Sequence, residues 1–421
     1  MNKAIYISLG LVVASSVLAD SFLSKTVNSQ SDEIKKEHDL YEELKMLSEN
    51  ELINKCESDL ALACYVVGKK ITDDTREKKD INLAETMFLK GCKLKNPLSC
   101  FEIGILHDNS QSNHLDYVKA IEYYEKSCNL KVGTGCTNIA NIYMQGKGVK
   151  QDAQKAKEYY ERACDLIDGQ GCSNLGYMYN NGIGVKQDFS KAKEYYEISC
   201  ELDEGVGCSN LGFLYDKGNG VIQDYIYAKE YYQKGCDLKN GLGCFNLGSL
   251  YREGLGVKKD NNKAKDYLEK ACSLKEARAC IILGNLYDTE PLDTPDYLKA
   301  RNYYEQACHL GSDHGCLNVA SLYHEGLGVK AYEYVDKACS LNNGMSCRQM
   351  GLTYSTININ LPLSKKYFEK ACDLNDAIGC GMLGLYYTTL KEKNQYIQIS
   401  QQLLKKACDL GEKNFCKFIK N

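Results

Sequence analysis

The stretch that decides the fold is residues 164–199, CDLIDGQGCSNLGYMYNNGIGVKQDFSKAKEYYEIS. Its first half has apolar and small residues at i, i+3, i+4 and i+7, the spacing of one face of an α-helix. These residues are Cys172, Leu175, Gly176 and Tyr179. The pattern stops at the segment Gly-Ile-Gly-Val, 182–185, because two glycines break a helix.

A second amphipathic segment runs from about residue 189 to residue 202. Ala192, Tyr195, Tyr196 and Ser199 mark its buried stripe. A polar turn then leads to Cys208, which begins the next copy of the pattern. The stretch therefore predicts one helix–turn–helix unit.

The cysteines indicate that this unit is repeated along the chain, because all 22 fall into eleven pairs whose members are eight residues apart. The pairs are Cys56 and Cys64, Cys92 and Cys100, Cys128 and Cys136, Cys164 and Cys172, Cys200 and Cys208, Cys236 and Cys244, Cys272 and Cys280, Cys308 and Cys316, Cys339 and Cys347, Cys372 and Cys380, and Cys408 and Cys416. Successive pairs start 36 residues apart from Cys56 to Cys308, and the last three steps are 31, 33 and 36 residues. A fixed period in this range indicates a solenoid. The predicted fold class is all-α, an α/α solenoid of helix–turn–helix repeats.

The first cysteine of each pair lies near the end of one predicted helix, and its partner opens the next. A short turn between antiparallel helices brings the two sulfurs together, so we predict eleven disulfides, each within its own pair. Closing so short a loop contributes roughly 2.5 kcal/mol per bridge. Zinc sites prefer closer cysteine pairs or histidine partners, and the six histidines keep no register with the cysteines. We expect no metal and no cofactor.

Small residues recur at two further positions, where close approach of helices would exclude a larger side chain. Four residues after the second cysteine stand Gly68, Gly104, Ala140, Gly176, Gly212, Gly248, Gly284, Ala320, Gly351 and Gly384, with Lys420 in the terminal unit. On the second helix stand Ala84, Ala120, Ala156, Ala192, Ala228, Ala264, Ala300 and Ala331. Tyrosines are expected to fill the space between layers, namely Tyr143, Tyr179, Tyr215, Tyr251, Tyr287 and Tyr323.

The composition excludes some partners. Fifty-two Lys and Arg residues against 56 Asp and Glu residues give a net charge of −4, without the basic excess that nucleic acid binding requires. The 22 cysteines are too many for a reduced cytosolic protein.

The first residues predict export. Lys3 precedes an apolar run, residues 5–14, and a small-residue cleavage site follows at residues 17–19. The alternative is a membrane anchor, but this run is shorter than the ~20 residues that a spanning helix needs. We therefore predict a signal peptide at residues 1–19 and a secreted or periplasmic protein with no membrane span after cleavage.

The motifs Asn-Leu-Gly-x-x-Tyr, Gly-x-Gly-Val and Lys-Ala-x-x-Tyr-Tyr together resemble the Sel1-like repeat, a relative of the tetratricopeptide repeat. With its paired cysteines the chain is similar to the Helicobacter cysteine-rich proteins, which are secreted α/α solenoids. The resemblance covers residues 43–421 and assigns them to the solenoid. Residues 20–42 are polar and are predicted to form a flexible leader.

In the tetratricopeptide relatives, the helix with Leu-Gly-x-x-Tyr lines the concave face, and an asparagine there contacts the peptide. The matching residues, two after the second cysteine, are Asn138, Asn174, Asn210, Asn246 and Asn318. An asparagine offers two donors and an acceptor, so a row of them can pair with an extended peptide backbone. The alternative is that these amides only bond neighbouring helices. The predicted partner is a protein or peptide, with a cell-wall peptide or a β-lactam among the candidates.

The resemblance also implies penicillin binding and weak β-lactamase activity, the alternative function. Serine β-lactamases carry Ser-x-x-Lys with Lys-Thr-Gly and Ser-x-Asn partners. The chain has one Ser-x-x-Lys, Ser190 to Lys193, and no Lys-Thr-Gly. The six histidines, His38, His107, His114, His309, His314 and His324, form no metallo-β-lactamase motif. The catalytic residues of such an activity are therefore unknown.

Overall fold

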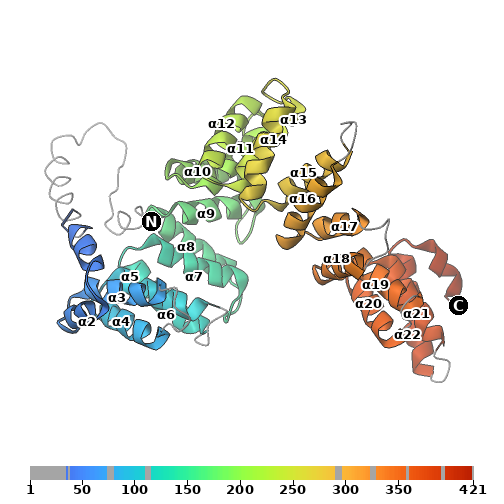
Figure 1. Cartoon of the computed structure of the whole chain (residues 1–421), viewed down its shortest axis with the longest axis horizontal. Coiled ribbons are helices and arrows are strands. Elements are labelled where there is room, and N and C mark those ends of the chain that lie inside the picture. The colour runs from blue at the N-terminus through green and yellow to red at the C-terminus, as the bar shows by residue number, and fades with distance from the viewer. Residues whose placement is uncertain are drawn as a thin grey trace. The chain divides into compact units, whose positions relative to one another are not determined.

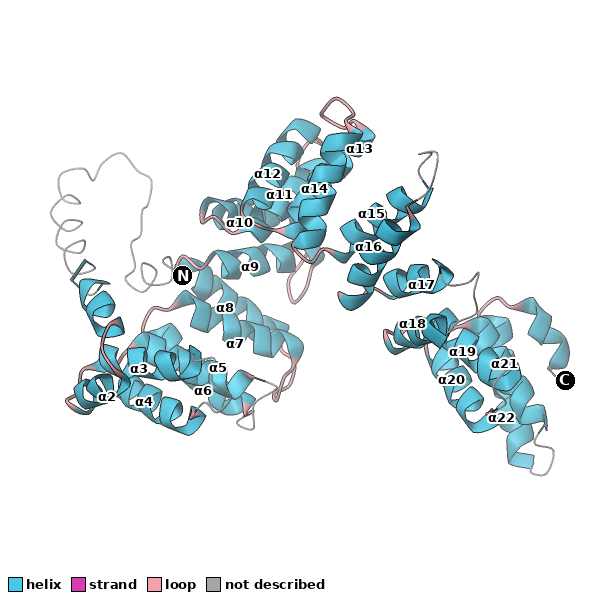
Figure 2. Cartoon of the chain, viewed as in Figure 1, coloured by secondary structure: helices cyan, strands magenta, loops and turns pink. Residues whose placement is uncertain are grey.

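The computed structural model describes residues 35–36, 38–73, 80–109, 115–289, 296–322, 329–356, 360–389 and 394–419. All regular secondary structure of these residues is helical (Figure 2), which confirms the predicted all-α class. Residues 38–45 are already helical, so the end of the predicted leader, 38–42, lies in a helix. The predicted signal peptide, His114, Tyr323, His324 and Lys420 lie outside the described residues.

The chain divides into two compact units, 1–238 and 239–421, which are described separately. The first unit runs from blue to green in Figure 1. Its helices are α2 (Glu49–Glu57), α3 (Ala61–Asp73), α4 (Ile81–Lys93), α5 (Pro97–Asp108), α6 (Tyr117–Asn129), α7 (Gly133–Gln145), α8 (Ala153–Asp165), α9 (Gly169–Asn181), α10 (Phe189–Glu201), α11 (Gly205–Lys217) and α12 (Tyr225–Asp237).

The second unit runs from yellow to red in Figure 1. Its helices are α13 (Gly241–Glu253), α14 (Asn261–Ser273), α15 (Ala277–Thr289), α16 (Tyr297–His309), α17 (Asp313–Leu322), α18 (Val329–Ser340), α19 (Gly344–Thr356), α20 (Leu361–Asp373), α21 (Ala377–Thr389), α22 (Asn394–Asp409) and the 3-10 helix η1 (Lys413–Phe418).

Each helix packs against the next helix in sequence within its unit, as the sequence pattern predicts. We call the helix that begins beside the second cysteine of a pair the first helix, and its successor the second helix. First helices also contact first helices, since α9 touches both α7 and α11.

The pair α9–α10 shows how the sequence defines helix ends. Gly182 ends α9 with a φ of 67°, the left-handed conformation that glycine adopts without a steric cost. The second glycine, Gly184, also has a φ of 67°. Asp188 then begins α10, because its carboxylate accepts the backbone N–H groups of Ser190 and Lys191 at 3.0 and 3.1 Å. The Gly-x-Gly-Val segment is thus a helix stop, as expected.

The disulfides follow the predicted pairing, with Cα–Cα distances of 4.4 to 5.1 Å in ten bridges between cysteines eight residues apart. These bridges join Cys56 to Cys64, Cys92 to Cys100, Cys128 to Cys136, Cys164 to Cys172, Cys200 to Cys208, Cys272 to Cys280, Cys308 to Cys316, Cys339 to Cys347, Cys372 to Cys380 and Cys408 to Cys416. Cys236 and Cys244 are disulfide-bonded as well, and no cysteine in the described part of the chain is free. Each bridge encloses the turn from a second helix to the next first helix.

The third residue after the first cysteine takes a left-handed backbone in these turns. Gly311 and Gly411 hold this place in two of them, but Ile167 has a φ of 63° in the turn after α8. A β-branched residue there is strained, because its Cβ crowds the following carbonyl. The disulfide turns therefore carry local backbone strain that is not predictable from their sequence.

The small residues allow close helix packing, as predicted. A Cβ atom on Gly176 of α9 would lie 2.7 Å from two ring carbons of Tyr196 on α10. Ala192 on α10 is fully buried. Further along the same pair, Tyr179 stacks on Tyr195 with 5.7 Å between ring centroids. The ammonium group of Lys191 lies 5.0 Å from the Tyr179 ring, a cation–π distance.

Candidate functional site

The five predicted asparagines lie on first helices, Asn138, Asn174 and Asn210 on α7, α9 and α11, and Asn246 and Asn318 on α13 and α17. All five are half-buried. Each asparagine stands two residues after the second cysteine of its pair. The residues two before, five after and nine after that cysteine lie on the same helix face. We call this face of the first helices the amide stripe.

Buried tyrosines hold two of these amides. Asn138 donates to the Tyr124 hydroxyl on α6, and that hydroxyl donates to the Asp108 carboxylate on α5 at 3.3 Å. Burial raises the pKa of Tyr124, so its hydroxyl keeps its proton and acts as donor and acceptor together. The relay therefore ties three consecutive helices.

The next repeat has the same arrangement. Asn174 donates to the Tyr160 hydroxyl on α8, which donates to Asn141 Oδ1 on α7 at 2.6 Å. Burial raises the pKa of Tyr160 to about 12. Asn138 and Asn174 thus bond neighbouring helices, one of the two roles that the sequence left open. An amide that makes one such bond can still bond a ligand, because it has two donors and an acceptor.

Exposed apolar side chains accompany the asparagines on α9 and α11. Tyr177 is 52% exposed and lies three residues after Asn174. Val206 and Phe213, 40% and 39% exposed, flank Asn210 at i−4 and i+3. Because α9 contacts α11, these side chains and amides form one surface, which lies in the green part of the first unit in Figure 1.

This surface has little charge. The stripe positions of α9 and α11 hold one ionisable basic group, Lys217, whose ammonium lies 3.2 Å from the Asp216 carboxylate and 5.7 Å from the Phe213 ring. Amides beside exposed aromatic rings suit an uncharged ligand that offers backbone groups and apolar side chains. Phe213 was not predicted as a site residue from the sequence, although α9 and α11 both carry an aromatic residue five positions after the second cysteine.

The hydrolase candidates do not come together. Ser190 is exposed in the first turn of α10, and Lys193 pairs with Glu197 one turn further along that helix. His309 and His314 are exposed. His107 is buried, with Nε2 3.3 Å from a Glu85 carboxylate oxygen.

The described residues contain no group of three His, Cys, Asp or Glu side chains placed to hold a metal ion. Within the same residues, no helix has the length and apolar character needed to cross a membrane.

The Sel1 repeat family matches nine segments of the chain, at residues 97–132, 134–168, 169–204, 205–240, 241–275, 277–312, 313–343, 344–376 and 379–412. A search of curated proteins found no match. The pair α3–α4, before the first matched segment, has the same helix–turn–helix arrangement.

Several solved structures are similar. The antigen c5321 of uropathogenic Escherichia coli, which displays an SLR fold, is 22% identical with a TM-score of 0.53, over 86% of this chain and 79% of that chain. A Sel1 repeat protein from Oxalobacter formigenes is 27% identical with a TM-score of 0.50, over 53% and 92% of the chains. Helicobacter pylori cysteine rich protein B is 38% identical with a TM-score of 0.27, over 33% and 99% of the chains.

Nine matched segments account for most of the sequence, and their boundaries coincide with the helix pairs and disulfide turns of the structure. The first helices, with their amide stripe, belong to these repeats. The chain is a member of the Sel1 repeat family.

Proposed function

We propose that the chain is a secreted or periplasmic scaffold that binds an extended peptide or protein segment along the amide stripe of its first helices. Sel1-repeat proteins generally act as protein-interaction modules. The many disulfides favour an oxidising compartment outside the cytoplasm, and the predicted signal peptide agrees with export.

One observation carries the proposal, the surface of α9 and α11 that joins half-buried Asn174 and Asn210 to exposed Tyr177 and Phe213. Amide groups can pair with a peptide backbone without selecting its side chains. Exposed aromatic rings supply contact area at a low cost in conformational entropy. No observation on the described residues favours lactam hydrolysis, so this alternative is not proposed.

The test begins with random-peptide phage display on the oxidised protein, followed by calorimetric titration of the selected peptide. Two double variants probe the surface, Asn174→Ala with Asn210→Ala, and Tyr177→Ala with Phe213→Ala. The matched control replaces Glu194 and Glu230 by alanine, because both are exposed on the second helices of the same repeats. We expect at least a tenfold loss of affinity for each double variant and no change for the control.

The two variants separate contact from stability. Asn174→Ala also removes the bond to Tyr160, so circular dichroism and thermal unfolding must show that the variant remains folded. Weaker binding by the aromatic variant alone would assign the asparagines to helix bonding only. Unchanged affinity in both folded variants would refute the proposed site.

A further inference from the structure

One repeat of the second unit departs from the tyrosine–aspartate pairing of its neighbours. Five second helices bury a tyrosine four residues before the cysteine, namely Tyr124, Tyr160, Tyr196, Tyr232 and Tyr304. Three of their hydroxyls donate to an aspartate eight residues after the second cysteine. The distances are 3.3 Å for Tyr124 to Asp108, 3.2 Å for Tyr232 to Asp216 and 3.3 Å for Tyr304 to Asp288.

In the repeat formed by α13 and α14, both partners are replaced. Leu268 takes the place of the tyrosine, and Arg252 takes the place of the aspartate. Leucine is shorter than tyrosine and has no hydroxyl, and arginine reverses the charge of the carboxylate. In the other repeats with an apolar residue for tyrosine, the aspartate position holds Thr72, His324, Ser355 or Thr388, so a permanent positive charge there is particular to this repeat.

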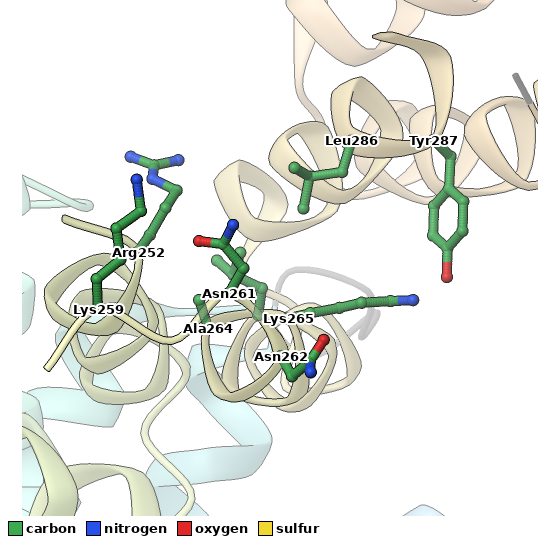
Figure 3. Close-up of a pocket in the computed structure, with 9 residues that line it drawn as sticks. Arg252, Lys259, Asn261, Asn262, Ala264, Lys265, Leu286 and Tyr287 are labelled. Atoms are coloured by element: carbon green, nitrogen blue, oxygen red, sulfur yellow. The ribbon is translucent and has the colours of Figure 1, made fainter. Parts of the chain in front are cut away.

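A pocket of about 430 Å³ lies at this place, between α13, α14 and the end of α15. Leu268, Leu286 and the ring of Tyr287 form its apolar wall. Figure 3 shows that Arg252 and Lys259 extend their charged ends on the same side, with the Asn261 amide beside them. The volume is within the range usual for small-molecule sites.

The lining of the pocket is cationic. Arg252, Lys259 and Lys265 line it, and none of the described residues that line it is acidic. The Arg252 guanidinium lies 3.2 Å from the Glu253 carboxylate, but both side chains are largely exposed, and such a pair binds weakly. Lys265 reaches over the Tyr287 ring, with 4.7 Å between its ammonium nitrogen and the ring centroid (Figure 3).

We infer that this pocket binds a small organic anion, a carboxylate or phosphate joined to a compact apolar or aromatic body. The planar guanidinium of Arg252 can bind two oxygens of such an anion, and Lys259 and Asn261 add donors beside it. The apolar body then packs against Leu268, Leu286 and the Tyr287 ring. This site is formed by residues from α13 to α15 and by none of α9 or α11, and the inference does not depend on peptide binding.

The test uses calorimetry on the full oxidised protein at constant salt, with indole-3-acetate and phenyl phosphate as the two anionic probes. Indole-3-acetamide is the neutral counterpart of the first, and inorganic phosphate lacks the apolar body of the second. We expect one site per chain with a Kd below about 1 mM for at least one organic anion. The matching probe without the charge (indole-3-acetamide) or without the apolar body (inorganic phosphate) should bind at least tenfold more weakly. The stronger organic probe identifies the preferred anion.

Two variants restore residues that other repeats carry, Leu268→Tyr to fill the pocket and Arg252→Asp to reverse its charge. Each should weaken binding at least tenfold and remain folded by circular dichroism. The control Lys191→Asp makes the same kind of charge reversal near the start of α10 and should leave affinity within twofold.

Equal binding of the acetate and the acetamide would refute the need for an anion. Equal binding of inorganic and phenyl phosphate would refute the apolar contact. The proposal is refuted if folded Leu268→Tyr binds with unchanged affinity. It is also refuted if neither organic anion saturates the protein at millimolar concentration.

Discussion

Replacing Gly176 by alanine should destabilise the α9–α10 pair, against the trend of helix propensity. Alanine is favoured over glycine within a helix by about 1 kcal/mol. At this position, however, the new Cβ atom would lie 2.7 Å from Cδ1 and Cε1 of Tyr196 and 3.2 Å from the Ala192 carbonyl oxygen. The steric cost and the propensity gain therefore have opposite signs.

The structure gives the size of the steric cost. The Tyr196 ring must move by about 0.8 Å to reach an ordinary carbon–carbon contact of about 3.5 Å. It is only 2% exposed, so neighbouring side chains must move as well. Overpacking of this kind costs roughly 1–3 kcal/mol, and a carbonyl on the other side favours the upper half of that range. We expect a net loss of about 1–2 kcal/mol.

The assay is amide hydrogen exchange, because a repeat array opens locally and a single unfolding free energy does not describe it. The amides of α9 and α10 should exchange faster in Gly176→Ala than in wild type. Gln170→Ala, an exposed position on the same helix, serves as control and should change stability by less than about 0.5 kcal/mol.

A double-mutant cycle identifies the cause. Tyr196→Leu copies the residue that accompanies Gly248, where a Cβ atom would lie 3.2 Å from Leu268 Cγ. In the Tyr196→Leu background, the destabilisation caused by Gly176→Ala should be smaller by at least about 1 kcal/mol. Ala140 holds the same register in α7, so the clash depends on where the Tyr196 ring lies. Exchange in Gly176→Ala as slow as in wild type would refute the packing argument.

Three further predictions concern the same region. Burial raises the pKa of Asp168, so the folded protein holds this proton more tightly than the unfolded chain, and stability falls as the pH rises through the folded pKa. Asp168→Asn, which copies Asn240 at the same helix start, should therefore unfold at a higher temperature than wild type at pH 7, and the advantage should vanish below the unfolded pKa of about 3.9. Cys164→Ala with Cys172→Ala should lower the opening free energy of α8 and α9 by about 2.5 kcal/mol, and a loss under about 1 kcal/mol in hydrogen exchange would contradict the loop-closure argument. Ile167→Asn should raise the same free energy by about 1 kcal/mol, since asparagine tolerates the left-handed backbone, and an unchanged value would show that the strain is absorbed elsewhere.

Much of the fold could be predicted because its signals are local. Apolar spacing such as Cys172 to Tyr179 defines a helix face within a single segment, and cysteines eight residues apart meet whenever a short turn joins two helices. The glycine four residues after the second cysteine likewise indicates a close helix contact that recurs in most repeats. The left-handed turn residue was not predictable, because Ile167 is a residue type that disfavours this conformation.

The site was less predictable, because it depends on distances between helices. The sequence predicted that Asn138 and Asn174 lie on the first helices, but it could not show that tyrosine hydroxyls on the second helices would bond them. Hydroxyl partners depend on how two helices rotate against each other, which a periodic pattern does not determine. The pocket beside Leu268 arises from two substitutions, at Arg252 and Leu268, that only the packed helices bring together.

The disulfides between cysteines eight residues apart also determine whether cleavage by a protease separates the chain into two fragments. Hydrolysis of a peptide bond between Cys164 and Cys172 opens a small covalent ring, and the two halves of the chain stay joined through sulfur. Hydrolysis in a Gly-x-Gly-Val segment such as 182–185 lies outside every ring and leaves only noncovalent packing to hold the fragments. Half of the turns in such an array can therefore be nicked without dividing the molecule.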